Sequence, residues 1–144
     1  MNNLIQRFQV IGFKEKTDAR FHKIDGYDAY QIEQMVEKFV VEQLYEYEID
    51  YDLIGIAITG SRSRGLERPD SDLDVVIEFN TDIKEYVLFN ILHEEPFSIG
   101  GIPVDINPIR KEETGELENY LHNAEKYLAN KEETKSEIRI RMEQ

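Results

Sequence analysis

Two aspartates separated by one residue, Asp72 and Asp74, stand at the start of an apolar stretch and are the side chains best suited to chemistry. Successive side chains of a β-strand point to opposite faces, so both carboxylates would leave the strand on the same face. Two like charges held this close are costly unless a cation lies between them. Mg²⁺ prefers oxygen ligands and is commonly bound together with phosphates, so the spacing predicts a magnesium site.

A turn bounded by Gly60 and Gly65 precedes the two acids. Glycine lets the backbone approach a polyphosphate closely, Ser61 adds a hydroxyl donor, and Arg62 and Arg64 add positive charge. We therefore expect Gly60, Ser61, Arg62 and Arg64 to bind the phosphates of a ligand. For either arginine, the alternative is a solvated side chain on a loop.

An ordinary surface turn is the competing interpretation of the whole segment, because turns favour serine, glycine and aspartate for conformational reasons alone. The order of the parts argues against it. An apolar strand over 53–58 is followed by Gly-Ser, by Arg-Gly, and by Ser-Asp-x-Asp at the start of a second apolar strand over 75–79. This ordered combination favours a functional site that binds phosphate and metal side by side.

The same segment resembles the nucleotidyltransferase superfamily that includes DNA polymerase β, and within it the minimal nucleotidyltransferases. The family pattern is Gly-Ser after a hydrophobic strand, a short loop often ending in Arg-Gly, and Asp-hydrophobic-Asp on the next strand; it matches residues 59–61, 64–65 and 71–75. The family usually adds a third carboxylate on a later strand, and Asp105 between two apolar residues fits it. From spacing alone, Asp105 could equally be a lone acid at a strand end. The resemblance covers about residues 30–110.

This resemblance implies an α/β (α+β) fold with a small mixed β-sheet flanked by helices. It implies catalysis by Asp72, Asp74 and Asp105, which would bind two Mg²⁺ ions while an acceptor hydroxyl attacks the α-phosphorus of a nucleoside triphosphate (NTP). Asp105 would either help to deprotonate the acceptor or position it. Arg62 or Arg64 would offset the charge of the departing pyrophosphate.

Three functions from different classes are compatible with this resemblance. The first is an active nucleotidyltransferase that modifies a small molecule, a protein side chain or an RNA end. The second is an antitoxin-like minimal nucleotidyltransferase that modifies or binds a partner protein. The third is a nucleotide-binding regulator without turnover, which the presence of all three acids disfavours. Larger members of the superfamily add a second domain, so a homodimer or a partner complex would complete the site here.

Composition limits the class of protein. The 144 residues have the length of one domain, and we expect a single domain over 1–144 with an N-terminal extension over 1–26 and a charged tail over 131–144. Cysteine is absent, which excludes disulfides and zinc–thiolate sites. No apolar run approaches the roughly 18 residues of a membrane span, and the N-terminus does not resemble a signal peptide. We therefore expect a cytoplasmic protein.

The formal net charge of −13 disfavours extended binding to DNA or long RNA, which depends on clustered lysine and arginine. An NTP needs only a local cluster of arginines together with its metal. The three histidines, His22, His93 and His122, are too scattered for a zinc site, and a lone histidine is more often structural.

Apolar spacing predicts the elements that position these residues. Helical spacing over 28–47 and 81–93 indicates two helices, with Thr81 and Asp82 as caps of the second. Strands are expected over 53–58 and 75–79, a short helical turn over 63–66, and a hairpin over 96–106 around Gly100 and Gly101. Helical spacing over 117–128 indicates a covering helix, and residues 8–13 fit a short strand or helix.

Two further groups of residues have weaker functional interpretations. Five tyrosines precede the first strand, and one of them could stack on a nucleobase, although tyrosines at such a junction usually pack; they are Tyr27, Tyr30, Tyr45, Tyr47 and Tyr51. Asp70 is expected to cap its turn rather than to bind metal.

Overall fold

A computed structural model describes residues 20–124 and residue 126 of the chain. The expected element over 8–13 and the expected tail over 131–144 lie outside this part. The described elements are a mixture of helices and strands, as the sequence predicted for an α/β (α+β) chain. Among the described residues, no helix is both long enough and apolar enough to cross a bilayer.

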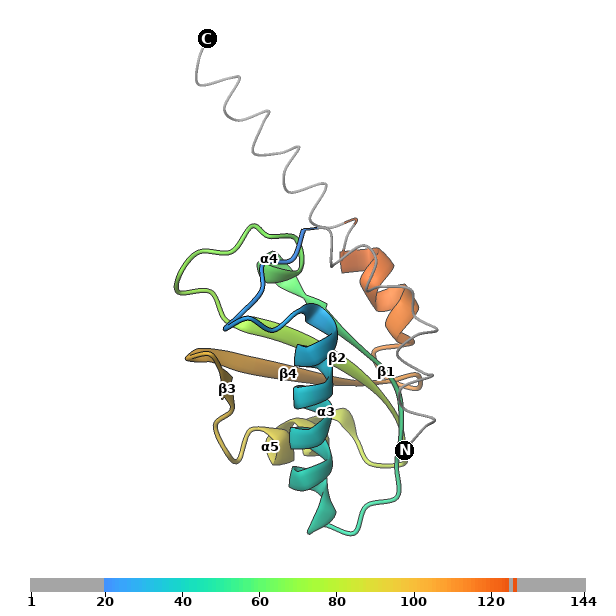
Figure 1. Cartoon of the computed structure of the whole chain (residues 1–144). Helices are drawn as coiled ribbons and strands as arrows, with labels where there is room; N and C mark the ends of the chain where they lie inside the picture. Colours follow the sequence, from blue (N-terminus) through green and yellow to red (C-terminus); the bar gives the residue numbers. More distant parts are fainter. Residues whose placement is uncertain (1–19, 125, 127–144) are drawn as a thin grey trace.

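Four strands of the described chain form one mixed sheet in the order β1-β2-β4-β3. Strands β1 (Asp52–Thr59) and β2 (Leu73–Asn80) run antiparallel, and β2 runs parallel to β4 (Ile102–Arg110). The short strand β3 (Ser98–Ile99) pairs with the start of β4. The sheet therefore aligns the end of β1 with the starts of β2 and β4 (Figure 1).

Helix α3 (Ala29–Tyr45) confirms the first predicted helix. Its N-cap is Asp28, whose carboxylate accepts the backbone N–H of Gln31 while the Gln31 side chain accepts the N–H of Asp28. This reciprocal pair satisfies two backbone donors that a helix start otherwise leaves free. One apolar stripe of α3 is buried against the sheet; it comprises Ile32, Val36, Val40 and Leu44.

Helix α5 (Glu85–Leu92) begins four residues later than the sequence predicted, and Thr81 and Asp82 do not cap it. Thr81 instead closes the preceding turn, because its hydroxyl donates to the Asp50 carbonyl and accepts from the N–H of Ile83. Residues outside the helix hold the start of α5 in place. The Glu85 carboxylate accepts the backbone N–H groups of Arg110 and Thr114, and the Thr114 hydroxyl also donates to it.

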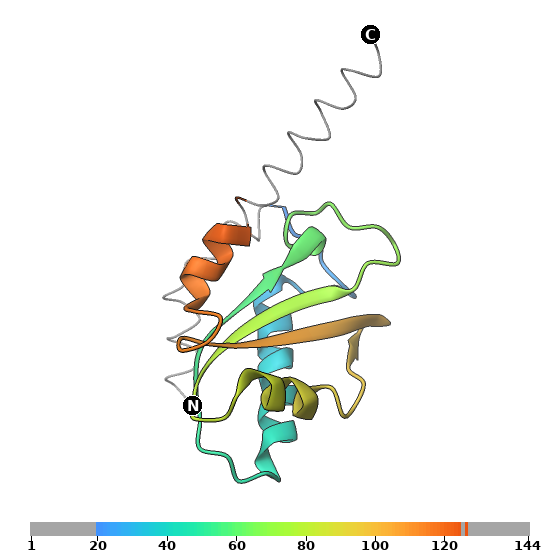
Figure 2. The same ribbon diagram turned by 180° about the vertical axis from the view of Figure 1, so that it is seen from behind.

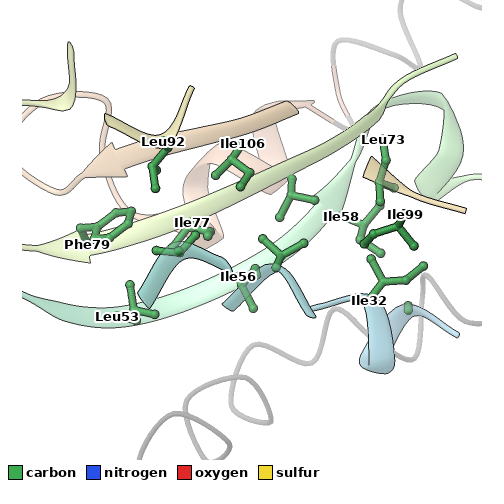
Figure 3. Packing of buried hydrophobic residues seen from close by; sticks show 14 of the residues in the cluster. Ile32, Leu53, Ile56, Ile58, Leu73, Ile77, Phe79, Leu92, Ile99 and Ile106 are labelled. Carbon is green, nitrogen blue, oxygen red and sulfur yellow. The ribbon is translucent and has the colours of Figure 1, made fainter. Parts of the chain in front are cut away.

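The main hydrophobic core fills the space between one face of the sheet and helices α3 and α5. Figure 3 shows side chains from β1, β2 and β4 meeting side chains from both helices and from β3. Burying apolar surface of this kind supplies most of the favourable free energy of folding. The labelled members are Ile32, Leu53, Ile56, Ile58, Leu73, Ile77, Phe79, Leu92, Ile99 and Ile106.

The opposite face of the sheet carries a smaller apolar cluster. Residues 117–124 are helical, and Leu117 packs there on Ala57, Val76 and Ile109. This segment, orange in Figures 1 and 2, is the described part of the covering helix predicted over 117–128. Its Leu117 N–H donates to the buried Glu78 carboxylate at 2.7 Å. The sheet therefore has a large apolar cluster on one face and a small one on the other. Asp74 and Asp105 lie on the face with the small cluster.

The predicted hairpin is confirmed around Gly100 and Gly101. Both glycines have positive φ angles, 56° and 79°, which a two-residue hairpin turn of the primed type requires. Strand β4 then continues to Arg110, further than the predicted arm, and runs beside β2 along its length. This pairing brings Asp105 to the edge of the sheet where the two earlier acids lie.

Candidate active site

Asp74 and Asp105 are directly paired positions on the parallel strands β2 and β4. Paired residues of neighbouring strands point to the same face, so the two carboxylates leave the sheet side by side. Asp72 precedes Asp74 by two residues and is exposed just before β2 begins. The three acids named from the sequence thus gather at one edge of the face opposite the main core.

Gly60 provides the space that the Asp74 carboxylate occupies. A Cβ placed on Gly60 would lie 2.5 Å from Asp74 Oδ2, closer than real Cβ atoms come to other atoms. The residue also has a φ of +73°, which is strained for other residues. Glycine is therefore required here so that β1 can end directly against the carboxylate of the neighbouring strand.

The Asp74 carboxyl is electrostatically strained. Its pKa is raised above the ordinary value of 3.8, first by burial and then by the negative charges of Asp105 and Asp72. Both causes act against the charged form. A cation placed between the acids would offset the free-energy cost of ionising Asp74. The raised pKa of Asp74 therefore indicates that the three acids fit a divalent metal ion.

The side chains nevertheless do not form a finished metal site. Within the described residues, no three histidine, aspartate or glutamate groups lie close enough together to hold a metal ion. Mutual repulsion between carboxylates favours such separation when no cation lies between them. Backbone positions thus bring the acids together, and binding of a metal would require their side chains to converge.

Helix α4 (Gly60–Ser63) follows β1 without a linker, three residues earlier than the predicted helical turn over 63–66. Its first turn is closed by the Ser63 hydroxyl, which donates to the Gly60 carbonyl. Ser61 is half-buried in this turn. The short helix therefore places the Gly60–Ser61 backbone directly beside the Asp74 carboxylate.

The two arginines of this loop have different surroundings. Arg62 is only 7% exposed, and its Nε donates to the Ser71 carbonyl at 3.0 Å, which ties the loop to the residue before Asp72. Arg64 is half-buried, and among residues 20–124 no hydrogen bond to its side chain is found. The geometry therefore suits Arg62 to holding the loop in place. The guanidinium of Arg64 is the one better placed to contact a ligand.

The rest of the loop is held by contacts other than those predicted. The turn before β2 is closed by Ser71, which accepts the Arg68 N–H on its hydroxyl, and not by the exposed Asp70. A Cβ on Gly65 would clash with the Arg20 carbonyl oxygen. Gly65 is therefore needed for packing against the chain before α3.

A histidine missed by the sequence interpretation contacts the third acid. His93, at the end of α5, places Nε2 2.9 Å from Asp105 Oδ1 and Nδ1 2.7 Å from the Phe89 carbonyl oxygen. Its ring stacks on Phe89 with centroids 3.8 Å apart. The histidine looked isolated because only the folded chain brings α5 beside β4.

A cavity of about 340 Å³ opens beside Asp74 and Asp105, a volume at the lower end of the range for small-molecule sites. Asp74, Asp105 and Asn107 contribute polar groups to its lining, and Phe89 and Tyr120 contribute rings. None of the five tyrosines singled out earlier lines it. The other described residues of the lining are Thr59, Gly60, Val75, Val76 and Ala124.

Comparison with known protein families gives one result that agrees with this geometry. A family profile described as "Nucleotidyltransferase domain" matches residues 41–140 of the 144-residue chain. The chain belongs to this family. As a nucleotidyltransferase, it is an enzyme of the class that the Gly-Ser and Asp-x-Asp pattern indicated. The match extends past β4 through the helical residues 117–124, which line part of the cavity. Searches of curated proteins and of solved structures give no match.

Proposed function

We propose that this nucleotidyltransferase moves a nucleoside monophosphate from an NTP to an acceptor hydroxyl, with Asp72, Asp74 and Asp105 binding Mg²⁺. The observation that carries the proposal is the direct pairing of Asp74 with Asp105 beside the Gly60 turn. When bound, the divalent ions would supply charge stabilisation to the entering and leaving oxygens. The residues of the chain bind and orient the two substrates.

Strand order supports an assignment of the two substrate sides. Thr59, Asp74 and Asp105 form one row across β1, β2 and β4. Displacement at phosphorus places the attacking and leaving oxygens roughly in line. With the β- and γ-phosphates at Gly60 and Ser61, the α-phosphorus would lie over Asp74, and the acceptor would approach from the Asp105 side.

In the proposed transfer, one bond forms at the α-phosphorus and one breaks. A bond forms between the acceptor oxygen and the α-phosphorus, the bond from the α-phosphorus to the bridging oxygen breaks, and pyrophosphate departs with the electron pair. Asp105, exposed at the acceptor side, would accept or orient the hydroxyl proton. Arg64 and the amides around Gly60 would offset the charge of pyrophosphate.

The cavity beside the acids supports a small organic group as part of the bound substrates. Asn107 offers one amide, and Phe89 and Tyr120 offer apolar ring surface. Such a combination of ring walls and a few polar groups is typical of small-molecule sites. The net charge of −13 disfavours a long nucleic acid as the acceptor.

Transfer of a label from each of the four NTPs tests this proposal. The protein is incubated with Mg²⁺, a lysate of its source cells and NTP labelled at the α-phosphate, and the labelled product is then identified. We expect label from at least one NTP on a lysate component with the wild-type protein and none with Asp74→Asn. Absence of transfer from all four NTPs, or equal transfer by the variant, would contradict the proposal.

A further inference from the structure

The end of α5 reaches the acceptor side of the site, where His93 contacts Asp105. His93 is the C-cap of α5, and it uses both ring nitrogens, one toward Phe89 of its own helix and one toward Asp105 on β4. A carbonyl oxygen can only accept, so Nδ1 donates to Phe89. In the second contact Nε2 is the donor and the carboxylate oxygen Oδ1 of Asp105 is the acceptor.

The His93 imidazole is also held in place by contacts within its own helix. Its ring stacks on Phe89 at 3.8 Å with an interplanar angle of 26°. Helix α5 is itself anchored in the main core by Leu88, Ile91 and Leu92. At the other end of the helix, the Glu85 carboxylate accepts the N–H groups of Arg110, the last residue of β4, and of Thr114. A continuous set of packed and hydrogen-bonded groups thus leads from the core to the Asp105 carboxylate.

Asp105 needs such a support more than Asp74 does. Its side chain is 54% exposed, whereas the Asp74 carboxylate lies in the space left by Gly60. An exposed carboxylate rotates freely unless a neighbour holds it. The bond to His93 occupies Oδ1 and leaves Oδ2 as the oxygen available for a ligand.

We propose that His93 is a positioning residue, which holds the Asp105 carboxylate by Oδ1 so that Oδ2 binds the divalent cation on the acceptor side. This inference rests on the proposed function, since it assigns a support to one of its metal ligands. Hydrogen-bonding partners of metal-binding carboxylates act in this way, and losing one typically costs 10- to 100-fold in metal affinity or activity. His93 does not itself touch the reacting atoms in this account.

The test uses the full chain and variants that separate the hydrogen bond from the packing. His93→Leu removes the donor, whereas His93→Gln keeps an amide N–H at a comparable reach. His122→Ala is the matched control, because His122 is exposed on the helical segment 117–124 and does not line the cavity. The measurements are the dissociation constant of Mn²⁺ for the free protein, the thermal midpoint, and kcat and KM for the NTP.

We expect His93→Leu to weaken Mn²⁺ binding and lower kcat by about 10-fold or more, with KM for the NTP little changed. His93→Gln should recover most of both losses, and His122→Ala should match the wild type. In an Asp105→Asn background, His93→Leu should have no further effect on Mn²⁺ binding, since the cycle isolates the pair. If His93→Leu fails to fold, His93→Phe, which keeps a ring to stack on Phe89 but has no hydrogen-bond donor, should show the same losses.

Unchanged Mn²⁺ binding in His93→Leu would overturn the inference, as would an equal loss in the Asp105→Asn background. Equal losses in the glutamine and leucine variants would do the same. The failure of this inference is distinguishable from failure of the proposed function. A wild-type protein that binds no Mn²⁺ contradicts the metal site itself, whereas wild-type binding that is insensitive to His93 contradicts only the support.

Discussion

Asp74 and Asp105 occupy paired positions on parallel strands, although helix α5 and the hairpin separate them in sequence. The pairing places two carboxylates side by side on the sheet face that does not carry the main core. Most surface acids avoid one another, because proximity of like charge raises the free energy of the fold. The arrangement is therefore expected to cost stability in the absence of a cation, and this cost can be measured.

Replacing Asp74 by asparagine should stabilise the metal-free protein at neutral pH. The pKa of Asp74 is raised, so the folded state holds its proton more tightly than the unfolded state. Its contribution to stability is therefore present below the ordinary pKa of 3.8 and is lost as the pH rises through the raised value. We expect a gain of about 1 kcal/mol or less at pH 7, because the carboxylate is half-exposed.

Urea denaturation at several pH values measures this gain for Asp74→Asn. The difference from the wild type should shrink toward zero as the pH falls to 3.8, and Asp70→Asn at an exposed acid outside the group serves as control. Mg²⁺ should stabilise the wild type more than the variant. If Asp74→Asn were less stable than the wild type at pH 7, the predicted sign of the stability change would be wrong.

Gly60→Ala and Gly101→Ala form a matched pair of variants. Both glycines have positive φ angles, 73° and 79°, so either alanine should cost about 1 kcal/mol through backbone strain. Only the Cβ on Gly60 meets Asp74; the one on Gly101 has nothing within 4 Å. We expect Gly60→Ala alone to lose NTP and metal binding, as measured by calorimetric titration. Equal binding by both variants would mean that the Gly60 cradle does not position Asp74.

Arg62→Gln and Arg64→Gln separate the two roles proposed for the arginines. Arg62 is buried and donates to Ser71, so its loss should destabilise the fold by about 1–3 kcal/mol. Arg64 should instead affect the NTP, raising the dissociation constant with the thermal midpoint nearly unchanged. Unfolding curves and NTP titrations of both variants check this, and the reverse pattern would exchange the two assignments.

Asp105→Asn should separate binding from transfer. The amide keeps the size of the side chain and its place beside Asp74, but it cannot take the acceptor proton. We expect the rate of transfer to fall about 100-fold or more, while the dissociation constant of the NTP changes much less. An equal loss of NTP binding would assign Asp105 to binding the nucleotide metal rather than to the acceptor side.

The sequence predicted the sheet, its helices and the acids because these depend on local order. Apolar runs marked β1 and β2, and the glycine pair marked the hairpin. The start of α5 was placed wrongly, because Thr81 has the side chain of a helix cap but uses it in a turn. A threonine serves either purpose, and only the distant Asp50 carbonyl decides between them.

The contacts that hold the site residues in place could not be predicted from the sequence in the same way. His93 carries no local signal, since its partner Asp105 is reached only after the chain has turned through β3. Tyr120 appeared as one member of an apolar stripe, and its place in the cavity depends on how residues 117–124 lie on the sheet. The burial of Arg62 and its bond to the Ser71 carbonyl could not be predicted either, because they depend on how the loop folds over β2.

Binding of a nonhydrolysable NTP with and without Mg²⁺ is a direct test of the proposed carboxylate–metal site, since it requires no knowledge of the acceptor. The dissociation constant is measured by calorimetry for the wild type and for Asp74→Asn. If Asp72, Asp74 and Asp105 converge on the metal, Mg²⁺ should tighten binding by at least about 10-fold in the wild type and have little effect in the variant. Equal affinity with and without Mg²⁺ in the wild type, or the same Mg²⁺ dependence in Asp74→Asn, would contradict the account.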